Sequence, residues 1–186
     1  MSQQDTHVEQ PTDLRRPLTP AELIDRLSRF QGPPQEFLVN LLAVQCRLSG
    51  AQSGAILRPG AEGRIDVLAV YPPVDGGQTA PPWLAQAVQS TPRAIRQGGT
   101  LVQPLAGSDD LYGQPAREHV VIIPLKGGPQ GVRGVAAFRI EQRDPLAVGD
   151  ARARLELTVS LLSLYEMRLT LQRRQTDLSR LRTSLE

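Results

Sequence analysis

The sequence of 186 residues contains few aromatic residues, one cysteine and one lysine. Aromatic side chains make up only 4% of the chain, so aliphatic side chains must supply most of any core. Hydrophobic residues, at 40% of the chain, are numerous enough to form one core of ordinary size. Cys46 is the single cysteine, which excludes an internal disulfide and gives no sign of an oxidising compartment.

Long apolar segments and a strong net charge are also missing. The N-terminus does not resemble a signal peptide, and no segment approaches the ~20 apolar residues that a membrane span needs. The net charge is only +2, and the pI is near 9.1 because 20 of the 21 basic residues are Arg. Such a balance gives no strong field toward nucleic acid or a membrane. We therefore expect a cytoplasmic protein that neither binds nucleic acid nor inserts directly into a membrane.

The last forty residues contain neither Gly nor Pro after Asp150, and their leucines recur every seven residues. A strict seven-residue apolar repeat favours a left-handed coiled coil, because it keeps one stripe facing a partner along the helix. Leu161 occupies a companion position, but Arg168, Gln175 and Arg182 follow it, so the stripe is only half apolar. The predicted dimer seam comprises Leu157, Leu161, Leu164, Leu171, Leu178 and Leu185.

The first half of this helix is apolar on nearly every side, which is typical of a helix buried on several faces. We predict that this half packs on a domain formed by residues 18–165, and that residues 166–186 project from it as a coiled-coil helix or linker. A single amphipathic helix lying on its own domain is the alternative. Residues 1–17 are polar and are expected to be disordered. Because the repeat is unbroken at its last residue, we expect a longer protein or a piece cut from one.

Helix signals precede the predicted sheet and interrupt it. Thr19, followed by Pro20 and then by Glu22 three residues after the Thr, is a capping box that starts a helix reaching about residue 30. A second helix runs from about residue 37 to 48, and Gly50 is suited to end it. A third begins at residues 81–83 and is expected to break at Pro92.

Strand signals form two hairpins. Residues 54–58 and 65–71 flank a Pro-Gly turn, and residues 119–125 and 132–141 flank a glycine-rich one. A brief strand is expected at residues 100–102. Pro124 lacks a donor N–H and should lie at an edge or a bulge. Helices that bracket an antiparallel sheet give an α+β fold.

The final hairpin resembles that of a GAF domain. The resemblance rests on Val-Ile-Ile-Pro-Leu at 121–125, a glycine-bearing turn, and Gly-Val-Arg-Gly-Val-Ala-Ala-Phe at 131–138. It covers about residues 34–170, and the Pro-Leu and Gly-Val pairing favours GAF over the related PAS type. It implies a GAF-like central antiparallel sheet flanked by helices, a pocket roofed by the middle loops and helices, and terminal helices that dimerise and signal onward. Similar domains precede histidine kinases, cyclases, transcription factors and sometimes membrane-fusion-type secretion proteins.

Signs of catalysis and of bound cofactors are absent from the sequence. The Asn-Lys-Phe-Asp-Glu residues of cyclic-nucleotide-binding members do not occur, and Cys46 lies on the first core helix rather than where a bilin would attach. His119 has no Cys or carboxylate partners at ligand spacing, and no Ser or Cys has a neighbouring base. We therefore predict no enzyme activity, no metal and no cofactor.

The candidate ligand pocket lies in the middle segment, where aromatic and Arg side chains gather. A concave site with aromatic walls and Arg would suit a small ligand bearing a carboxylate or phosphate. Alternatively, the aromatic residues are core and the arginines are surface. The candidate pocket residues are Tyr71, Trp83, Arg93, Arg96, Tyr112 and Arg117.

These features lead to two hypotheses about function. The first is a non-catalytic sensory or regulatory module that forms a homodimer through its terminal helices and signals to a downstream output domain not present in this chain. The second is a degenerate GAF domain that serves as a structural dimerisation or adaptor domain, for example ahead of a membrane-fusion-type secretion protein.

Overall fold

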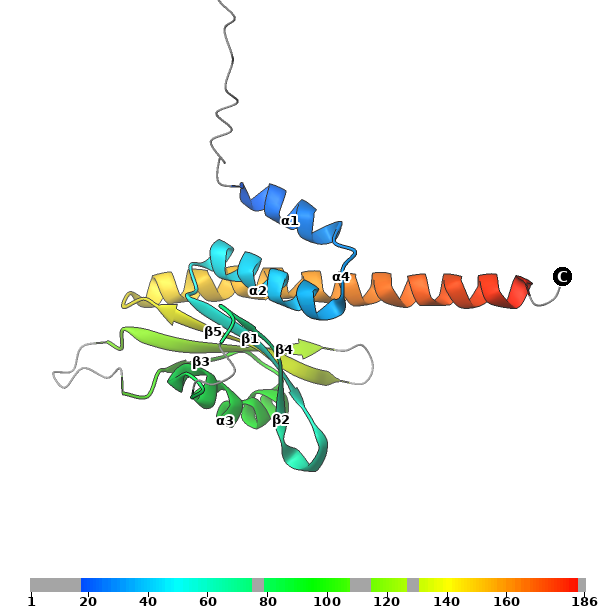
Figure 1. Ribbon diagram of the computed structural model, residues 1–186. Coiled ribbons are helices and arrows are strands. Elements are labelled where there is room, and N and C mark those ends of the chain that lie inside the picture. The colour runs from blue at the N-terminus through cyan, green and yellow to red at the C-terminus, as the bar shows by residue number, and fades with distance from the viewer. Residues whose placement is uncertain (1–17, 75–78, 108–114, 127–130, 184–186) are drawn as a thin grey trace, which may run out of the picture.

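The computed structural model describes residues 18–74, 79–107, 115–126 and 131–183 (Figure 1). The predicted disordered tail, residues 1–17, lies outside the described residues. The elements are α1 (Pro20–Ser28), α2 (Pro34–Ser49), β1 (Ser53–Pro59), the 3-10 turn η1 (Ala61–Gly63), β2 (Ile65–Tyr71), α3 (Pro82–Gln97), β3 (Leu101–Pro104), β4 (Glu118–Lys126), β5 (Val132–Glu141) and α4 (Pro145–Thr183).

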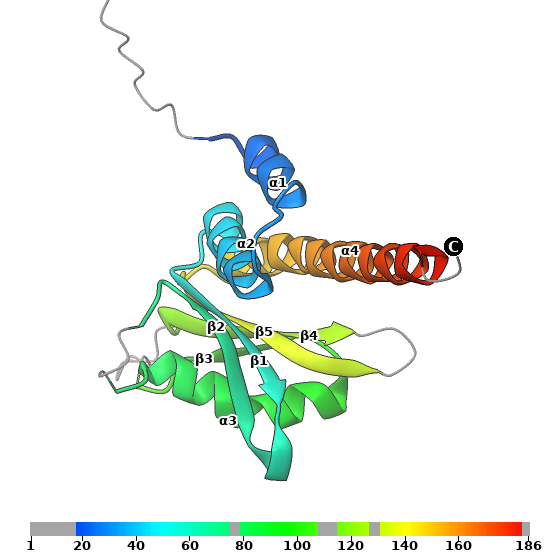
Figure 2. The ribbon, with the colours of Figure 1, turned by 45° about the vertical axis from the view of Figure 1, so that its right-hand side comes forward.

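The five strands form one antiparallel sheet in the order β2-β1-β5-β4-β3. Both predicted hairpins are present, and β5 of the second hairpin pairs with β1 of the first. Helices α2 and α4 cover one face of the sheet and α3 covers the other (Figure 2). The α+β fold predicted from the sequence is confirmed.

The face under α2 and α4 holds the larger part of the core. Leu42 and Cys46 of α2 and Leu155 of α4 pack against strand residues whose side chains alternate to this side. All of them are at most 8% exposed. The strand residues of this layer are Ile56, Ala69, Val121, Ile123, Ala136, Phe138 and Ile140.

The face under α3 is packed with smaller side chains. Trp83, Leu84, Ala87 and Ala94 form the inner side of α3 and contact alternate residues of three neighbouring strands. Those strand residues are Ala55, Leu57, Val120, Ile122, Val135 and Ala137.

The ends of the first two helices agree with the sequence prediction. Thr19 Oγ1 accepts a hydrogen bond from the Glu22 N–H, and the Glu22 carboxylate accepts one from the Thr19 N–H at 2.6 Å. Gly50 ends α2 with φ of +75°, a left-handed conformation that a residue with a Cβ adopts at a cost.

The predicted break at Pro92 does not occur, because α3 continues through it to Gln97. Pro92 lies on the exposed side of the helix, while Thr91 and Ala94 beside it are fully buried against the sheet. The Thr91 hydroxyl also donates a hydrogen bond of 2.8 Å to the Ala87 carbonyl. Packing on both sides of the proline therefore outweighs its local disruption of the helix.

Pro124 lies where its missing N–H costs little. Strand β3 pairs with β4 only as far as Leu101 opposite Ile122, so Pro124 lies beyond that pairing. The register of β4 with β5 also shifts between Leu125 and Lys126, next to the proline. This is the edge or bulge position that the sequence predicts for it.

Helix α4 is 39 residues long and continues past the sheet (Figure 1). Its inner side, Val148, Ala151, Leu155, Thr158 and Leu162, is buried against the domain, so α4 is anchored along its first half. No helix in the described part of the chain has the length and apolarity needed to cross a membrane.

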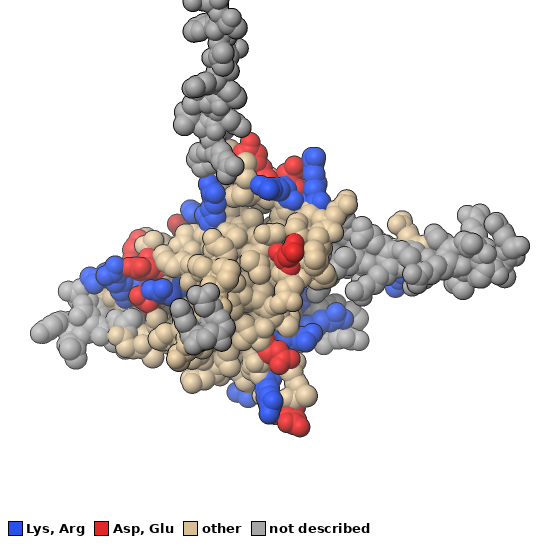
Figure 3. Space-filling model, viewed as in Figure 1, with Lys and Arg blue, Asp and Glu red and all other residues tan. Residues whose placement is uncertain are grey.

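Acidic and basic side chains are interspersed on the face that Figure 3 shows, with no large patch of one sign. This distribution fits the nearly balanced net charge.

Candidate functional site

A pocket of about 450 Å³ opens at the end of the sheet where α3 begins. At this end β1 starts, β5 finishes and β4 starts, so three neighbouring strands each contribute a polar residue on the α3 side. The pocket is lined by Ser53, Val70, Pro72, Pro73, Val74, Pro81, Pro82, Trp83, Leu105, Glu118 and Arg139.

The main polar feature of the pocket is an ion pair between Arg139 of β5 and Glu118 of β4. Arg139 Nε donates to Glu118 Oε2 at 3.0 Å, and Arg139 Nη2 donates to Oε1 at 2.9 Å. Both side chains are partly buried, with 30% and 24% of their surface exposed. Hydrogen bonding from Arg139 holds the pKa of Glu118 below its ordinary value. The pair is therefore charged at neutral pH.

The walls of the pocket are apolar and stiff. Trp83 is only 4% exposed, prolines precede it at 81 and 82, and two further prolines, at 72 and 73, also line the pocket. Ser53 adds one hydroxyl beside Arg139, its partner in the β1–β5 register. The pocket therefore combines apolar walls with one hydroxyl and a guanidinium that is already paired with a carboxylate, so an anion could bind Arg139 only in place of Glu118.

Of the six candidate pocket residues, Trp83 lines this pocket and Tyr71 does not. Tyr71 follows Val70 on β2, and because strand side chains alternate, Tyr71 packs on the α2 face and Val70 on the α3 face. Tyr71 instead lines a different pocket that it shares with Cys46. The two aromatic residues are thus on opposite sides of the sheet.

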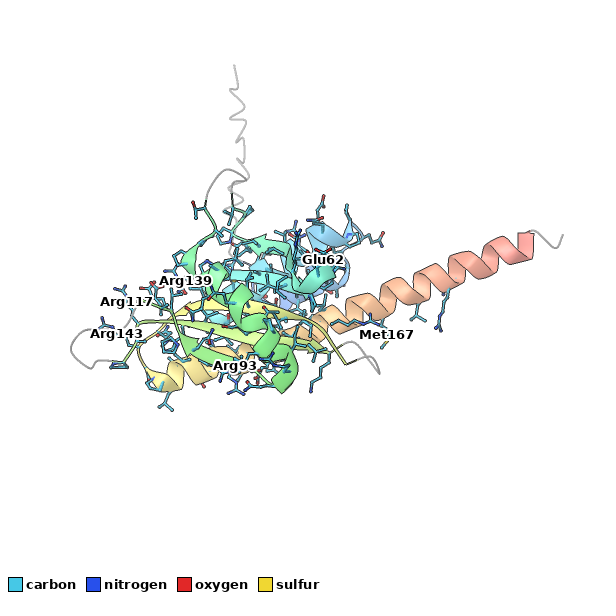
Figure 4. The ribbon with its side chains drawn as sticks, turned by 90° about the horizontal axis from the view of Figure 1, so that it is seen from below. Glu62, Arg93, Arg117, Arg139, Arg143 and Met167 are labelled. Atoms are coloured by element: carbon cyan, nitrogen blue, oxygen red, sulfur yellow. The ribbon has the colours of Figure 1, made fainter. Side chains whose placement is uncertain are left out.

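The candidate arginines are on the surface. Arg93 and Arg96 are exposed on α3, and Arg117, whose side chain is 62% exposed, forms an ion pair with Glu141. Figure 4 shows Arg93 on α3. Tyr112 lies outside the described residues. The structure therefore does not bring these arginines together with Trp83. For Arg93, Arg96 and Arg117 it agrees with the alternative interpretation of the sequence, in which the arginines are surface residues.

The sequence analysis missed Arg139, Glu118 and Ser53. A signal for Arg139 was available, because Val135, Ala137 and Arg139 alternate on one face of a predicted strand. A charged residue that continues a buried apolar face is expected to end in a partner or a pocket. The pairing with Glu118 depends on strand register and could not be read from the sequence.

Cys46 is 4% exposed in the α2 layer of the core, and burial raises the pKa of its thiol to about 12. Such a thiol is a poor nucleophile at neutral pH. Within the described residues, no group of three or more His, Cys, Asp and Glu side chains could hold a metal ion.

The structure describes only part of the predicted dimer seam, because the side chains of Leu164, Leu178 and Leu185 lie outside the described residues. Leu157 and Leu171 are 74% and 55% exposed. Leu161, unlike these two leucines, is half-buried and packs against the cluster of Leu27, Phe37, Leu41 and Leu162.

Met167 is the exposed companion of the leucines, with 61% of its surface accessible (Figure 4). Together with Leu146, which is 78% exposed, these side chains form what we call the α4 stripe: Leu146, Leu157, Met167 and Leu171. At 3.6 residues per turn they lie within about 80° of one another, on the side of α4 opposite its buried residues.

Comparison with known proteins identifies the fold. No protein-family model and no curated protein matches the sequence. Among solved structures, the A. aeolicus nlh2 GAF domain in an inactive state is 14% identical, with a TM-score of 0.58 over 80% of this chain and 96% of that one. The GAF domain of a phosphoenolpyruvate-protein phosphotransferase from Coxiella burnetii is 9% identical, with a TM-score of 0.52 over 81% and 95%. The chain therefore has the fold of a GAF domain.

Proposed function

We propose that the chain is a non-catalytic regulatory module of the cytoplasm. In this proposal it pairs with a second copy through α4 and passes the state of its pocket along that helix to a downstream output domain. The observation that carries the proposal is the α4 stripe, which leaves apolar side chains in water on the side of the helix away from the domain.

Pairing of two α4 helices would remove this exposed surface from water. Each buried large side chain stabilises an association by about 1.5–3 kcal/mol before the entropy of association is subtracted. Leu157 and Leu171 are fourteen residues apart, which is two repeats of seven, and a seven-residue repeat keeps such contacts in register along two helices.

The pocket is connected to α4 through one strand. Arg139 is on β5, which ends at Glu141, and α4 begins at Pro145 after only three intervening residues. A ligand anion that replaced Glu118 as the partner of Arg139 would therefore act on the strand that leads directly into the helix. The A. aeolicus domain is described as being in an inactive state, which is consistent with a fold that can adopt more than one state.

Light scattering on the 186-residue chain during size exclusion tests the pairing. We expect the mass of two chains for the unmodified protein and of one chain for the L157N/L171N variant. Arg93→Gln, an exposed change on α3 on the other face of the sheet, is the control and should leave the mass unchanged. A monomeric unmodified protein, or a variant that stays dimeric, would contradict the proposal.

Native mass spectrometry of the freshly purified chain tests the ligand. A bound anion would appear as added mass that disappears on denaturation and is lost in Arg139→Gln. The control variant Arg93→Gln should keep the added mass, because Arg93 is exposed on α3 outside the pocket.

A structural adaptor is the second candidate, and the packing under α3 favours it. Ala55, Leu57, Val120 and Ala137 are fully buried there, so aliphatic side chains occupy the space between α3 and the centre of the sheet. A dimer without added mass, with unchanged stability in the presence of small carboxylates and phosphates, would support this candidate over the regulatory one.

A further inference from the structure

Leu161 of α4 lies at the boundary between the α4 stripe and the buried side of the helix. It follows Leu157 by four residues, which is about 40° around the helix, and it precedes Leu162, which is 8% exposed. In the seven-residue repeat Leu161 occupies a companion position, and the three companion positions after it carry Arg or Gln. A pairing surface that included Leu161 would therefore be more apolar than one formed by the α4 stripe alone.

The structure keeps Leu161 away from such a surface. Leu157, one turn earlier, is 74% exposed, whereas Leu161 is half-buried. The difference arises because Leu161 packs against a cluster contributed by three helices. The buried members of this cluster are Leu27 of α1, Phe37 and Leu41 of α2, and Leu162 of α4.

Helix α1 is attached to the rest of the domain mainly at its end. Leu27 is the only buried residue of α1, and Phe30, in the connection to α2, adds a half-buried ring 6.1 Å from the ring of Phe37. A pocket of about 370 Å³ is lined by Leu23 of α1 and by Val44 of α2, so the first half of α1 does not close on α2. The ion pair of Arg29 with Asp25 lies within the α1 segment itself.

The position of α1 allows it to leave without opening the core. Figure 2 shows α1 on the side of α2 away from the sheet. The structure describes every residue of α1, and none of them belongs to the two core layers that cover the sheet. With nine residues, α1 is also too short to be a stable helix alone, so its order depends on these few contacts. Such weakly attached segments open at a lower free energy than the core.

We propose that α1 is an autoinhibitory contact on the pairing of α4. Docked α1 completes the cluster that holds Leu161, and release of α1 adds Leu161 to the surface on which two copies pair. This inference rests on the proposed pairing through the α4 stripe. Release gives up the contacts of Leu27 and Phe30, so the docked state is the resting state and the released state is the one that pairs more tightly.

Sedimentation equilibrium of the 186-residue chain tests the autoinhibitory contact. Leu27→Asp places a charge at the buried position of α1 and should release the helix. We expect a dissociation constant of the dimer about tenfold lower than that of the unmodified chain. A tenfold change corresponds to about 1.4 kcal/mol, which is within what burial of one Leu side chain provides. An unchanged or higher constant would overturn the proposal.

Two further variants of the α1 segment accompany Leu27→Asp. Ala21→Asp adds the same charge at an exposed position of α1 and is the matched control, which should leave the dissociation constant unchanged. Phe30→Ala removes a half-buried ring and should tighten pairing in the same direction as Leu27→Asp, so the test stands even if the charged variant does not fold. Equal tightening in Ala21→Asp would contradict the role of Leu27.

A double variant tests whether Leu161 is the residue that α1 withholds. In a chain that carries Leu161→Ala, adding Leu27→Asp should change the dissociation constant by less than about twofold, because the two changes act through one contact. A tenfold gain in this background would mean that release of α1 exposes another surface, and would overturn the assignment to Leu161.

Thiol labelling follows the release of α1 without pairing. In the L157N/L171N chain, the thiol introduced by Leu161→Cys should react with Ellman's reagent about two- to fivefold faster when Leu27→Asp is also present, because release of α1 exposes it. Equal rates would overturn the proposal. If the unmodified chain pairs and Leu27→Asp does not pair more tightly, only the autoinhibitory contact fails. If neither chain pairs, the proposed pairing fails as well.

Discussion

The side-chain amide of Gln45 donates a hydrogen bond of 3.1 Å to the hydroxyl of Thr158, and this contact joins α2 to α4 inside the protein. Gln45 is 1% exposed and Thr158 is 8% exposed. The Thr158 hydroxyl in turn donates to the Leu155 carbonyl at 2.9 Å, whereas Gln45 Oε1 has no partner among the described residues. A buried polar contact between two mostly apolar helix faces favours one register of the helices over others.

Substitutions of this pair should be unequal in effect. Thr158→Val removes the acceptor and leaves the Gln45 amide buried without a partner, so we expect a loss of about 1–3 kcal/mol in the free energy of unfolding. Gln45→Leu removes the orphaned oxygen as well, and the Thr158 hydroxyl keeps its bond to Leu155. We expect that variant to lose less than Thr158→Val. Urea unfolding followed by circular dichroism measures both, and equal losses would contradict the argument.

The ion pair of Glu118 and Arg139 predicts a dependence of stability on pH. Because the hydrogen bond from Arg139 lowers the pKa of folded Glu118 from 4.5, the pair contributes stability above the unfolded pKa. That contribution disappears as the pH falls through the folded pKa.

Glu118→Gln should therefore be less stable than the unmodified chain at pH 7, and the difference should shrink as the pH falls below about 4. Thermal unfolding between pH 7 and pH 3 measures this. Glu22 and Glu156 also have lowered pKa values, so Glu118→Gln should retain part of the acid sensitivity. A constant difference at all pH values would contradict the prediction.

Cys46 should be unreactive in the folded protein. With a pKa of about 12 it is a thiolate in about one molecule in ten thousand at pH 8, and its 4% exposure blocks access to reagents. We expect no reaction with Ellman's reagent over minutes at pH 8 and one thiol per chain after unfolding in urea. Rapid reaction of the folded chain would mean that α2 opens readily.

Gly134 should be intolerant of any side chain. A Cβ at this position would lie 2.5 Å from the Leu57 carbonyl oxygen, which belongs to the main chain of β1 and cannot move without disturbing the sheet. We expect Gly134→Ala to destabilise the chain by about 1–3 kcal/mol, as overpacking of a core does. Gly99→Ala is the control, because nothing lies within 4 Å of its Cβ. Chemical denaturation compares the two variants.

Local signals in the sequence were sufficient to predict most elements of the fold. The capping box at Thr19, the left-handed Gly50 and the glycine-rich turn between β4 and β5 act over a few residues, and the elements they delimit are present. Pro92 was misjudged because its effect on α3 is decided by packing against the sheet, which a local rule does not include.

The candidate site was harder to predict because it depends on which face each side chain occupies. Placing Tyr71 with Trp83 required the strand register of β2, and a shift of one residue exchanges Tyr71 for Val70. Arg139 and Glu118 come from strands joined by a hairpin, and only the register brings them together. The proximity of residues in the sequence therefore predicted the segment of the pocket but not its lining.

The length of α4 means that a small tilt at its base would produce a large displacement at its far end. Residues 163–183 extend about 31 Å, at 1.5 Å per residue, beyond Leu162, the last buried residue of α4 among those whose side chains the structure describes. If the helix stays rigid, a tilt of about 5° at its base moves its far end by about 3 Å, the scale of the helix shifts that carry allosteric signals. A rearrangement around Leu155 and Leu162 too small to disturb the core would thus become a displacement that a neighbouring helix can register.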